Sequence, residues 1–386
     1  MSITSLRAGI IGTGFIAPVH IEALRRIGVQ VTAVCGSTAG ARATADQWAI
    51  PEIYGDYDYR ALCASPNVDV IHITSPNKLH VEQALAALAA GKHVVCEKPL
   101  GMDTKETARV VKAAAKAKTV LAVNYNCRFF PAILQMRASV QRGDLGKIIH
   151  VQGHFFQDWL LKESDYNWRL LASEGGKLRA VGDIGTHWID ALSFILDSHV
   201  ESVFATTETF HKKRLRPARR GKDLRQSRPE NDGPLPGGYG GFRQPAPPLR
   251  QWRACQCRHL PGRRRLEMLP RPGHLRHRGQ HALGSPAAER NPGRPPRRAQ
   301  PNPPARHRRL PRDVAHFTDY PGGHPEGFPD SHQNELPRHL RTHRQRPEDP
   351  PLLFATAGDG HEEVKICEAV LKSAAAGKWV RVPGRD

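Results

Sequence analysis

The first 125 residues alternate between short apolar runs and amphipathic segments of helical period. Runs of strand length lie at 6–11, 29–35, 68–74, 93–96 and 120–124. Segments with apolar residues on one helical face lie at 79–90 and 104–117, and Asp103 and Glu106 are spaced to cap the second. Strands separated by long helices predict an α/β fold with a doubly wound parallel sheet, whose ligand crosses the carboxyl ends of the strands.

The first strand pattern runs directly into Gly12-Thr13-Gly14-Phe15-Ile16-Ala17, and a helical pattern follows. This placement is typical of dinucleotide-binding domains. Gly12 permits a tight turn, Gly14 lets the backbone approach a pyrophosphate, and the small Ala17 lets the helix pack on the strand. We therefore predict that Gly12, Gly14, Phe15 and Ile16 bind a nicotinamide dinucleotide; the alternative is a purely structural glycine turn.

The end of the second strand lacks the carboxylate that normally binds the ribose 2′-hydroxyl. The sequence has Gly36-Ser37-Thr38 there instead. A 2′-phosphate would meet no negative charge, and Ser37, Thr38 and Arg42 are candidates to bind it. Both NAD and NADP therefore remain open as the cofactor, with the alternative that Ser37 and Thr38 are only turn residues.

Several polar and proline residues follow the later strands, at the edge where the cofactor cleft should lie. The candidates for cofactor binding at this edge are Thr74, Pro76, Asn77, Glu97, Lys98 and Asn126.

Three motifs together resemble the glucose-fructose oxidoreductase, inositol dehydrogenase and rhizopine-catabolism family (Gfo/Idh/MocA). They are the glycine turn, Glu97-Lys98-Pro99, and the run Gly182-Asp183-Ile184-Gly185-Thr186-His187-Trp188-Ile189-Asp190. The resemblance covers residues 5–213 and reappears at 314–331 and 351–383. It implies an NAD(P)-binding Rossmann domain over 1–125. It also implies an α+β domain over 126–386, whose large open antiparallel sheet forms a homodimer or homotetramer.

The resemblance also implies an oxidoreductase of sugars or polyols in which Lys98, Asp183 and His187 form the catalytic group. Alcohol oxidation requires hydride transfer and removal of a proton, and an imidazole suits the second task. We expect His187 to accept the proton, Asp183 to orient it, and Lys98 to place a cation near the reacting oxygen. For each residue alone there is a structural alternative: Asp183 as a helix-terminal aspartate, His187 as a core histidine and Lys98 as a solvated lysine.

Five further residues resemble family positions that face the cofactor or the substrate: Asn77, His80, Arg128, Trp168 and Arg169. Each is also compatible with a cap, a surface residue or a packing role.

The net charge of +20 comes almost entirely from residues 211–350, which hold 31 Lys and Arg against 12 Asp and Glu and 24 of the 32 prolines. From Pro217 the apolar periodicity disappears, so 217–313 and 332–350 are predicted to be irregular or disordered. Our hypothesis is an out-of-frame translation of G/C-rich codons. One alternative is an Arg-rich arm that binds nucleic acid, which the scarcity of aromatic residues disfavours. Another is a nucleotide-binding remnant with impaired catalysis.

Seven cysteines, an odd and scattered set, indicate reduced thiols. Cys255 and Cys257 are too close together for a zinc knuckle, so no metal site is expected. The sequence shows neither a signal-peptide pattern nor an apolar run of membrane-spanning length, which predicts a cytoplasmic protein without membrane contact.

Overall fold

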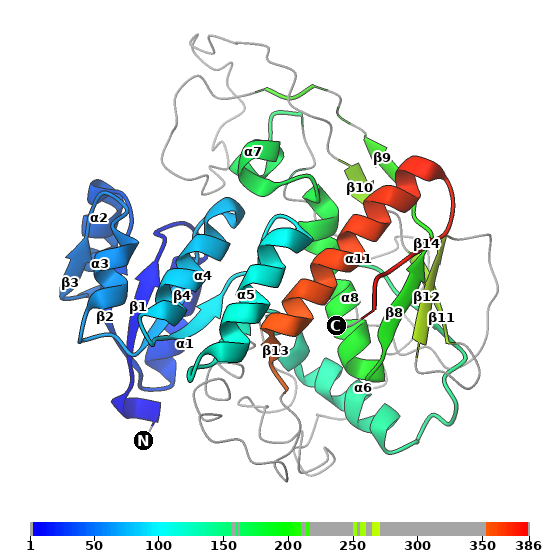
Figure 1. Ribbon diagram of the computed structural model, residues 1–386, viewed down its shortest axis with the longest axis horizontal. Coiled ribbons are helices and arrows are strands. Elements are labelled where there is room, and N and C mark those ends of the chain that lie inside the picture. The colour runs from blue at the N-terminus through cyan, green and yellow to red at the C-terminus, as the bar shows by residue number, and fades with distance from the viewer. Residues whose placement is uncertain are drawn as a thin grey trace, which may run out of the picture.

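The fold was analysed in a computed structural model. The structure describes residues 3–155, 160, 163–209, 211, 213–215, 250–252, 255–259, 265–270 and 353–384. Two regions lie side by side: the first is blue to cyan in Figure 1, and the second combines green segments with the red C-terminal helix. The fold is therefore α/β followed by α+β, as the sequence predicts.

A seven-stranded sheet forms the first region, in the order β13-β6-β5-β4-β1-β2-β3. Its strands are β1 (Arg7–Ile11), β2 (Gln30–Cys35), β3 (Glu52–Tyr54), β4 (Val70–Ile73), β5 (His93–Cys96), β6 (Leu121–Val123) and β13 (Ala355–Thr356). Neighbours are parallel except that β13 runs antiparallel to β6. The strand order reverses between β1 and β4, and this is the crevice where dinucleotides bind in open α/β sheets.

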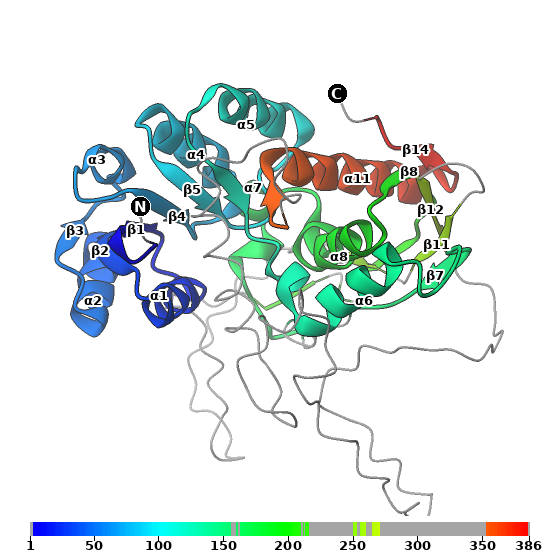
Figure 2. The ribbon, with the colours of Figure 1, turned by 90° about the horizontal axis from the view of Figure 1, so that it is seen from below.

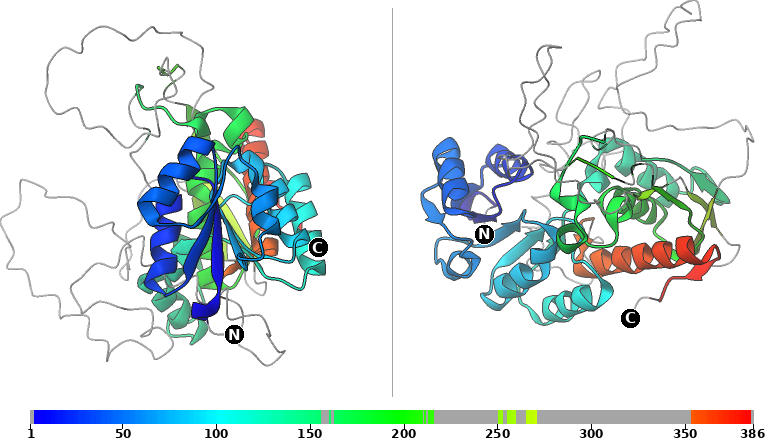
Figure 3. Two further views of the ribbon diagram at one scale, coloured as in Figure 1. Left: turned by 90° about the vertical axis from the view of Figure 1, so that its left-hand side faces the viewer. Right: turned by 90° about the horizontal axis from the view of Figure 1, so that it is seen from above.

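Helices cover both faces of this sheet (Figure 3). They are α1 (Ala17–Arg26), α2 (Thr38–Trp48), α3 (Tyr59–Ala64), α4 (His80–Ala89) and α5 (Thr104–Lys116). One apolar core packs Ile21 and Leu24 of α1 against the sheet. Leu62 of α3, Val81 of α4 and Val110 of α5 belong to a separate core. Burial on both faces explains why the strands read as continuous apolar runs.

The strands and helices predicted in this region are confirmed to within about two residues, the usual uncertainty of element boundaries. Asp103 caps α5 by accepting a hydrogen bond from the Glu106 amide at 2.9 Å, also as predicted. The sequence did not indicate α2, β3 or α3. These elements are short or rich in alanine and threonine, so their apolar periodicity is weak.

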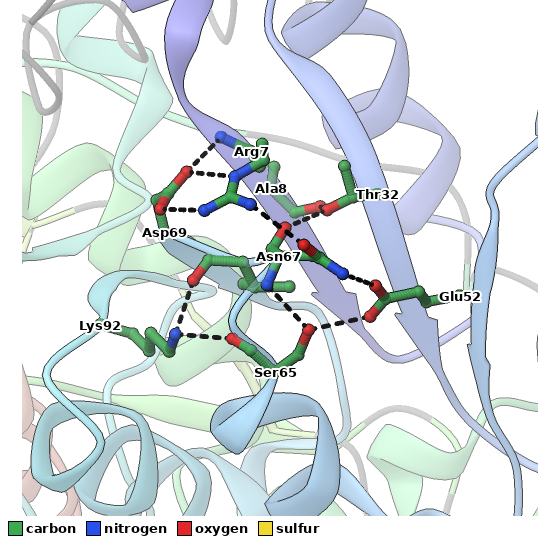
Figure 4. A network of polar contacts seen from close by, with 9 residues as sticks. Arg7, Ala8, Thr32, Glu52, Ser65, Asn67, Asp69 and Lys92 are labelled. Carbon is green, nitrogen blue, oxygen red and sulfur yellow. Dashed lines mark hydrogen bonds and ion pairs between the residues drawn. The ribbon is translucent and has the colours of Figure 1, made fainter.

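A polar network ties together the amino ends of the strands, away from the predicted cleft (Figure 4). Arg7 at the start of β1 donates from Nε and Nη2 to the two carboxylate oxygens of Asp69, at 3.0 and 2.9 Å. Glu52 at the start of β3 accepts from Ser65 at 2.9 Å and from Asn67 at 2.5 Å. The network fixes the loop before β4 and serves structure at the edge opposite the functional one.

The second region packs helices against a smaller sheet. Its helices are α6 (Pro131–Gln141), α7 (Ala172–Gly175), α8 (Thr186–Leu196) and α11 (Ala357–Ala376). Its five strands are β14 (Val380–Arg381), β8 (His199–Val203), β12 (Arg265–Pro270), β11 (Cys255–His259) and β7 (His150–Gln152), in that order. Helix α8 lies between α6 and α11 (Figure 2). Adjacent strands are antiparallel except for β12 with β8.

The structure differs from the sequence prediction within 217–313, where β11, β12 and a third strand, β10 (Arg250–Trp252), are formed. β10 pairs with β9 (Thr207–Thr209) outside the five-stranded sheet. Strand formation depends on the backbone of a partner strand as well as on side-chain pattern, and β7, β8 and β9 supply those partners. The predicted irregular segment 332–350, the resembling stretch 314–331 and most of 217–313 lie outside the described residues, so the frame hypothesis remains a hypothesis.

Helix α11 joins the two regions. Thr356 and Asp359 form a capping box at its start, and the preceding strand β13 completes the first sheet against β6. Phe354 lies in an apolar core with Phe129 and Phe194 of the second region. The apolar pattern near the end of the chain predicts a helix over 359–377 and a strand over 379–382, and both are confirmed. The return of the chain to the first sheet is not evident from the sequence.

Candidate active site

The glycine turn after β1 is shaped by its neighbours at the end of β4. Gly12 has φ of +109°, and a Cβ there would lie 2.7 Å from the Thr74 carbonyl carbon and 2.8 Å from the Ser75 nitrogen. Only glycine both adopts this positive φ without strain and lacks the Cβ that would collide with these atoms. The Thr74 hydroxyl donates to the carbonyl oxygens of Ile11 and Gly12 at 3.0 and 3.2 Å, so Thr74 secures the turn. The tight turn opening α1 fits a dinucleotide pyrophosphate.

The hydroxyl groups after β2 already have protein partners. Ser37 caps α2 by accepting from the Gly40 amide at 3.1 Å. Thr38 donates to the Asp56 carboxylate at 2.5 Å, and its oxygen accepts from the Asp56 amide at 3.2 Å. Arg42 is exposed on α2. Sequence reasoning missed Asp56 because it follows β3, a strand that the apolar pattern did not reveal.

Lys98 and Asp183 meet although they are 85 positions apart. The lysine amine donates to the Asp183 carboxylate at 2.9 Å and to the Asp183 carbonyl oxygen at 2.7 Å. Lys98 follows β5, and Asp183 lies in the π-helical turn η5 (Val181–Gly185) that precedes α8. Such turns often occur at functional sites. The structure therefore brings together two of the three predicted catalytic residues.

Arg169 connects this pair with the glycine turn. Its Nε lies 3.2 Å from the Asp183 carboxylate, and its guanidinium lies over the rings of Trp168 and Phe15, at 4.4 and 5.6 Å from their centres. Phe15 is 63% exposed, so much of its ring remains accessible beside the glycine turn. Arg169 thus joins the dinucleotide turn to the candidate catalytic aspartate.

The electrostatic surroundings keep Asp183 ionised. Burial alone would raise the pKa of this carboxyl, but Lys98 and Arg169 outweigh burial, and His187 adds to their effect. The pKa of Asp183 is therefore below its ordinary value. A persistent negative charge at this point stabilises cationic forms of the surrounding bases.

His187 lies one turn after Asp183, at the start of α8. It is 8% exposed and stacks on Phe155 with ring centres 5.8 Å apart, while Tyr125 meets it edge-on at 6.1 Å. Its Nδ1 atom lies 3.5 Å from the Cys127 sulfur. The three side chains that contact the ring come from the loop after β6, from η3 (Asn126–Phe129) and from the segment after β7.

The segment between β4 and the start of α4 holds three further candidates. Asn77 donates to the Gly175 carbonyl oxygen of α7 at 3.3 Å, and Pro76 precedes it at the start of η2 (Asn77–Leu79). His80 departs from the prediction that it faces the cofactor. Its ring is fully buried, and its Nδ1 and Nε2 atoms lie 2.7 and 2.8 Å from the carbonyl oxygens of Pro99 and Ser75. His80 therefore positions the Lys98-Pro99 segment rather than contacting a ligand.

Glu97 is also held by buried partners. Its carboxylate lies 3.0 Å from His20 Nε2 and accepts a hydrogen bond from the Asn124 amide, while His20 Nδ1 lies 2.9 Å from His72 Nδ1. Asn126, predicted beside the cofactor, is 1% exposed at the start of η3. Histidines 20 and 80 thus fix the two ends of the Glu97-Lys98-Pro99 segment.

Arg128 does not face a cleft, in contrast to the expectation from the sequence. Its Nε donates to both oxygens of Asp190 at 3.1 and 2.9 Å, and both residues are buried. Asp190 lies on α8, three residues after His187. This pair anchors α8 and is a structural feature, because both side chains are buried.

None of the described helices is long and apolar enough to cross a membrane.

Comparisons with known proteins agree with this geometry. Residues 6–125 match the model of an oxidoreductase family with an NAD-binding Rossmann fold, and residues 133–230 match the GFO/IDH/MocA C-terminal domain. Among solved structures, an oxidoreductase domain protein from Kribbella flavida has a TM-score of 0.71 at 24% identity, covering 98% of this chain and 99% of that chain. Levoglucosan dehydrogenase in complex with NADH and levoglucosan has a TM-score of 0.70 at 20% identity, with the same coverage. These likenesses show the fold.

Curated relatives match over the earlier part of the chain. Levoglucosan dehydrogenase of Pseudarthrobacter phenanthrenivorans is 36% identical over 152 residues, which is 39% of each chain. Inositol 2-dehydrogenase of Salmonella typhimurium is 36% identical over 157 residues, 39% of this chain and 46% of that protein. 1,5-anhydro-D-fructose reductase of Ensifer adhaerens is 34% identical over 51% of this chain and 59% of its own length.

The matched part is thus less than two thirds of the length of each of these relatives. The two family models nevertheless cover consecutive stretches that include the glycine turn, Lys98, Asp183 and His187. With its Rossmann sheet, glycine turn and second-domain motif in place, the chain belongs to the Gfo/Idh/MocA family of oxidoreductases.

Proposed function

We propose that this protein is an NAD(P)-dependent oxidoreductase that transfers a hydride between nicotinamide and a hydroxyl-bearing carbon of a sugar, a polyol or a derivative. The contact between Lys98 and Asp183, with Nζ to Oδ1 at 2.9 Å, carries the proposal. It joins a lysine at the end of a dinucleotide-binding strand to an aspartate of the second region, one turn before His187.

The residues present fit an alcohol oxidation. A nicotinamide dinucleotide, when bound, supplies the hydride acceptor. His187 accepts the proton of the substrate hydroxyl, and a hydride leaves the carbon that bears this hydroxyl. The carbon–oxygen bond then becomes a carbonyl. Lys98 donates to the reacting oxygen and stabilises its developing negative charge. The ionised Asp183 holds Lys98 in place and stabilises His187 once it has gained the proton.

Low solvent exposure strengthens these interactions. The side chains of Lys98 and Asp183 are 11% and 20% exposed, and His187 is 8% exposed. Charges interact more strongly where little water reaches them. The small remaining exposure leaves part of each of the three groups accessible to a substrate.

The names of the matched relatives support a cyclic substrate. They refer to levoglucosan, inositol and 1,5-anhydro-D-fructose, which are all rings that carry several hydroxyl groups. We propose a substrate of the same class for this chain. Formation of the second sheet supports a homodimer or homotetramer built through it, which sedimentation velocity measures, and a cytoplasmic location stays a prediction.

The proposal is tested in two stages. Fluorescence titration with NADH and NADPH measures cofactor binding, and a panel of cyclic sugars and polyols is then screened for reduction of NAD and NADP. We expect binding of at least one dinucleotide and turnover of at least one cyclic polyol. Binding without any turnover would instead identify a nucleotide-binding remnant, and absence of binding would contradict the cofactor assignment.

A further inference from the structure

We infer that Asp56 selects NAD over NADP by supplying the carboxylate that the end of β2 lacks. The inference rests on the proposed function and deepens it. The residues after β2 are Gly36-Ser37-Thr38, which contain no acidic side chain to bind a ribose 2′-hydroxyl or to repel a 2′-phosphate.

The sheet brings a carboxylate to this place from a neighbouring strand. β3 lies parallel to β2, and Cys35 and Tyr54 are partners at their carboxyl ends. The loops that follow are joined by backbone hydrogen bonds, from the Gly36 amide to the Tyr54 carbonyl at 3.2 Å and from the Tyr57 amide to the Gly36 carbonyl at 2.8 Å. Asp56 therefore lies beside the segment where the ribose-binding carboxylate is normally found.

Two hydrogen bonds fix Asp56 against Thr38. The Thr38 hydroxyl donates to Asp56 Oδ1 at 2.5 Å and accepts from the Asp56 amide at 3.2 Å. Asp56 has φ of +49°, a left-handed conformation that aspartate tolerates better than most residues. The carboxylate is exposed and lies at the first residue of α2, where the amino end of the helix favours a negative charge.

The same position adjoins the glycine turn. Cβ atoms built at Gly36 and Gly40 would both lie 2.8 Å from Thr13 side-chain atoms, and the Gly12 amide donates to the Cys35 carbonyl at 2.9 Å. The pyrophosphate turn and the Thr38–Asp56 pair are thus neighbours at one edge of the sheet, as the two ends of an adenosine diphosphate moiety require.

Charge then decides between the two cofactors. An NAD ribose can donate its hydroxyl hydrogen to Asp56, whereas an NADP 2′-phosphate would meet a carboxylate that already occupies the amino end of α2. Like charges within a few ångströms of each other are disfavoured. Thr38, predicted from sequence as a phosphate-binding hydroxyl, instead holds the group that repels a phosphate.

The test compares NADH and NADPH dissociation constants in the full-length protein, measured by fluorescence titration. Wild type should bind NADH about tenfold or more tightly than NADPH. Asp56→Asn should tighten NADPH binding and reduce the preference for NADH by about tenfold, because asparagine tolerates the left-handed backbone conformation and removes the charge. Asp56→Gly, which also suits the backbone, provides a second variant, and the thermal melting temperature of each checks folding.

Asp46→Asn is the matched control. Asp46 is exposed on α2, eight residues after Thr38, and the substitution changes the net charge equally. The preference of the Asp46→Asn variant for NADH over NADPH should stay within about twofold of the wild-type preference. An unchanged preference in both Asp56 variants, or a wild-type preference for NADPH, overturns the inference. Binding of neither dinucleotide overturns it together with the cofactor assignment, whereas binding without polyol turnover contradicts only the proposed activity.

Discussion

The amine of Lys98 donates two hydrogen bonds to a single residue, to the carbonyl oxygen of Asp183 at 2.7 Å and to its carboxylate at 2.9 Å. The pair connects the end of β5 with the turn before α8 and therefore fixes the distance between the dinucleotide-binding sheet and His187. Its geometry depends on a charged carboxylate, since Lys98 and Arg169 both interact with Asp183.

Asp183→Asn should lower kcat about 10²- to 10⁴-fold, the usual range when a proton-transfer group is misaligned. NADH affinity should change little, because the variant preserves shape and leaves the glycine turn intact. Steady-state kinetics and NADH titration measure the two effects. The control is Asp144→Asn, which removes an exposed ion pair with Arg142 at 2.7 Å and should leave both values near wild type. Equal losses in the two variants would contradict the assigned role.

His187→Ala should abolish most turnover and leave a space of imidazole size beside Phe155 and Tyr125. Free imidazole added to the assay should restore part of the rate, because the missing group is a diffusible base. The rate as a function of imidazole concentration is the measurement. Activity that falls in the variant but does not respond to imidazole would indicate a packing role for His187.

Gly12→Ala should weaken dinucleotide binding and destabilise the fold. The new Cβ would lie 2.7 Å from the Thr74 carbonyl carbon, in a backbone conformation with φ of +109°. Gly91→Ala is the matched control, because its φ is +71° and no atom of the described residues lies within 4 Å of a Cβ built there. The control should cost about 1–2 kcal/mol of unfolding free energy and leave NADH binding unchanged. Urea unfolding and NADH titration separate backbone strain from steric contact.

Glu363→Gln should alter the pH dependence of stability. Burial raises the pKa of Glu363 well above 4.5, assisted by Asp190 and opposed by Arg128. Burial also raises the pKa of Asp190 to about 6. A carboxyl with a raised pKa binds its proton more tightly when folded. The unfolding free energy of wild type should therefore fall as pH rises from about 4.5 toward the raised pKa of Glu363, with a slope of up to about 1.4 kcal/mol per pH unit.

The unfolding free energy of Glu363→Gln should fall less steeply as pH rises. The variant should therefore be more stable than wild type above neutral pH. Urea unfolding across the pH range measures the difference. Glu82→Gln, which removes an exposed ion pair with Arg109 at 3.0 Å, should follow the wild-type curve. Parallel curves for wild type and Glu363→Gln would show that Glu363 does not hold a proton in the folded protein.

The features that could be predicted from sequence are local in the chain. The glycine turn and the strand ends that carry Thr74 and Glu97 each follow from a short pattern, whereas Asp183 and His187 follow from the family resemblance. The assignment of Lys98 to the same site required the family resemblance, because no short pattern links residues 98 and 183.

Other features depend on contacts between distant segments and could not be read from the sequence. Asp56 reaches Thr38 only because β3 pairs with β2, and β13 completes the first sheet from more than 200 residues away. The family resemblance predicts that His80 faces the cofactor or the substrate, but its ring turns inward to the carbonyl oxygens of Ser75 and Pro99. Side-chain direction within a loop is set by packing, which a linear pattern does not record.

Deuterium transfer tests hydride transfer most directly. The protein is incubated with oxidised cofactor and with the cyclic polyol that gives the fastest turnover, deuterated at its carbinol carbons. The mass of the recovered reduced cofactor is then determined by mass spectrometry. We expect one deuterium per reduced cofactor with wild type, and about 10²-fold or slower accumulation with His187→Ala. Reduced cofactor without deuterium, or equal rates in the two proteins, would contradict direct hydride transfer at a site served by Lys98, Asp183 and His187.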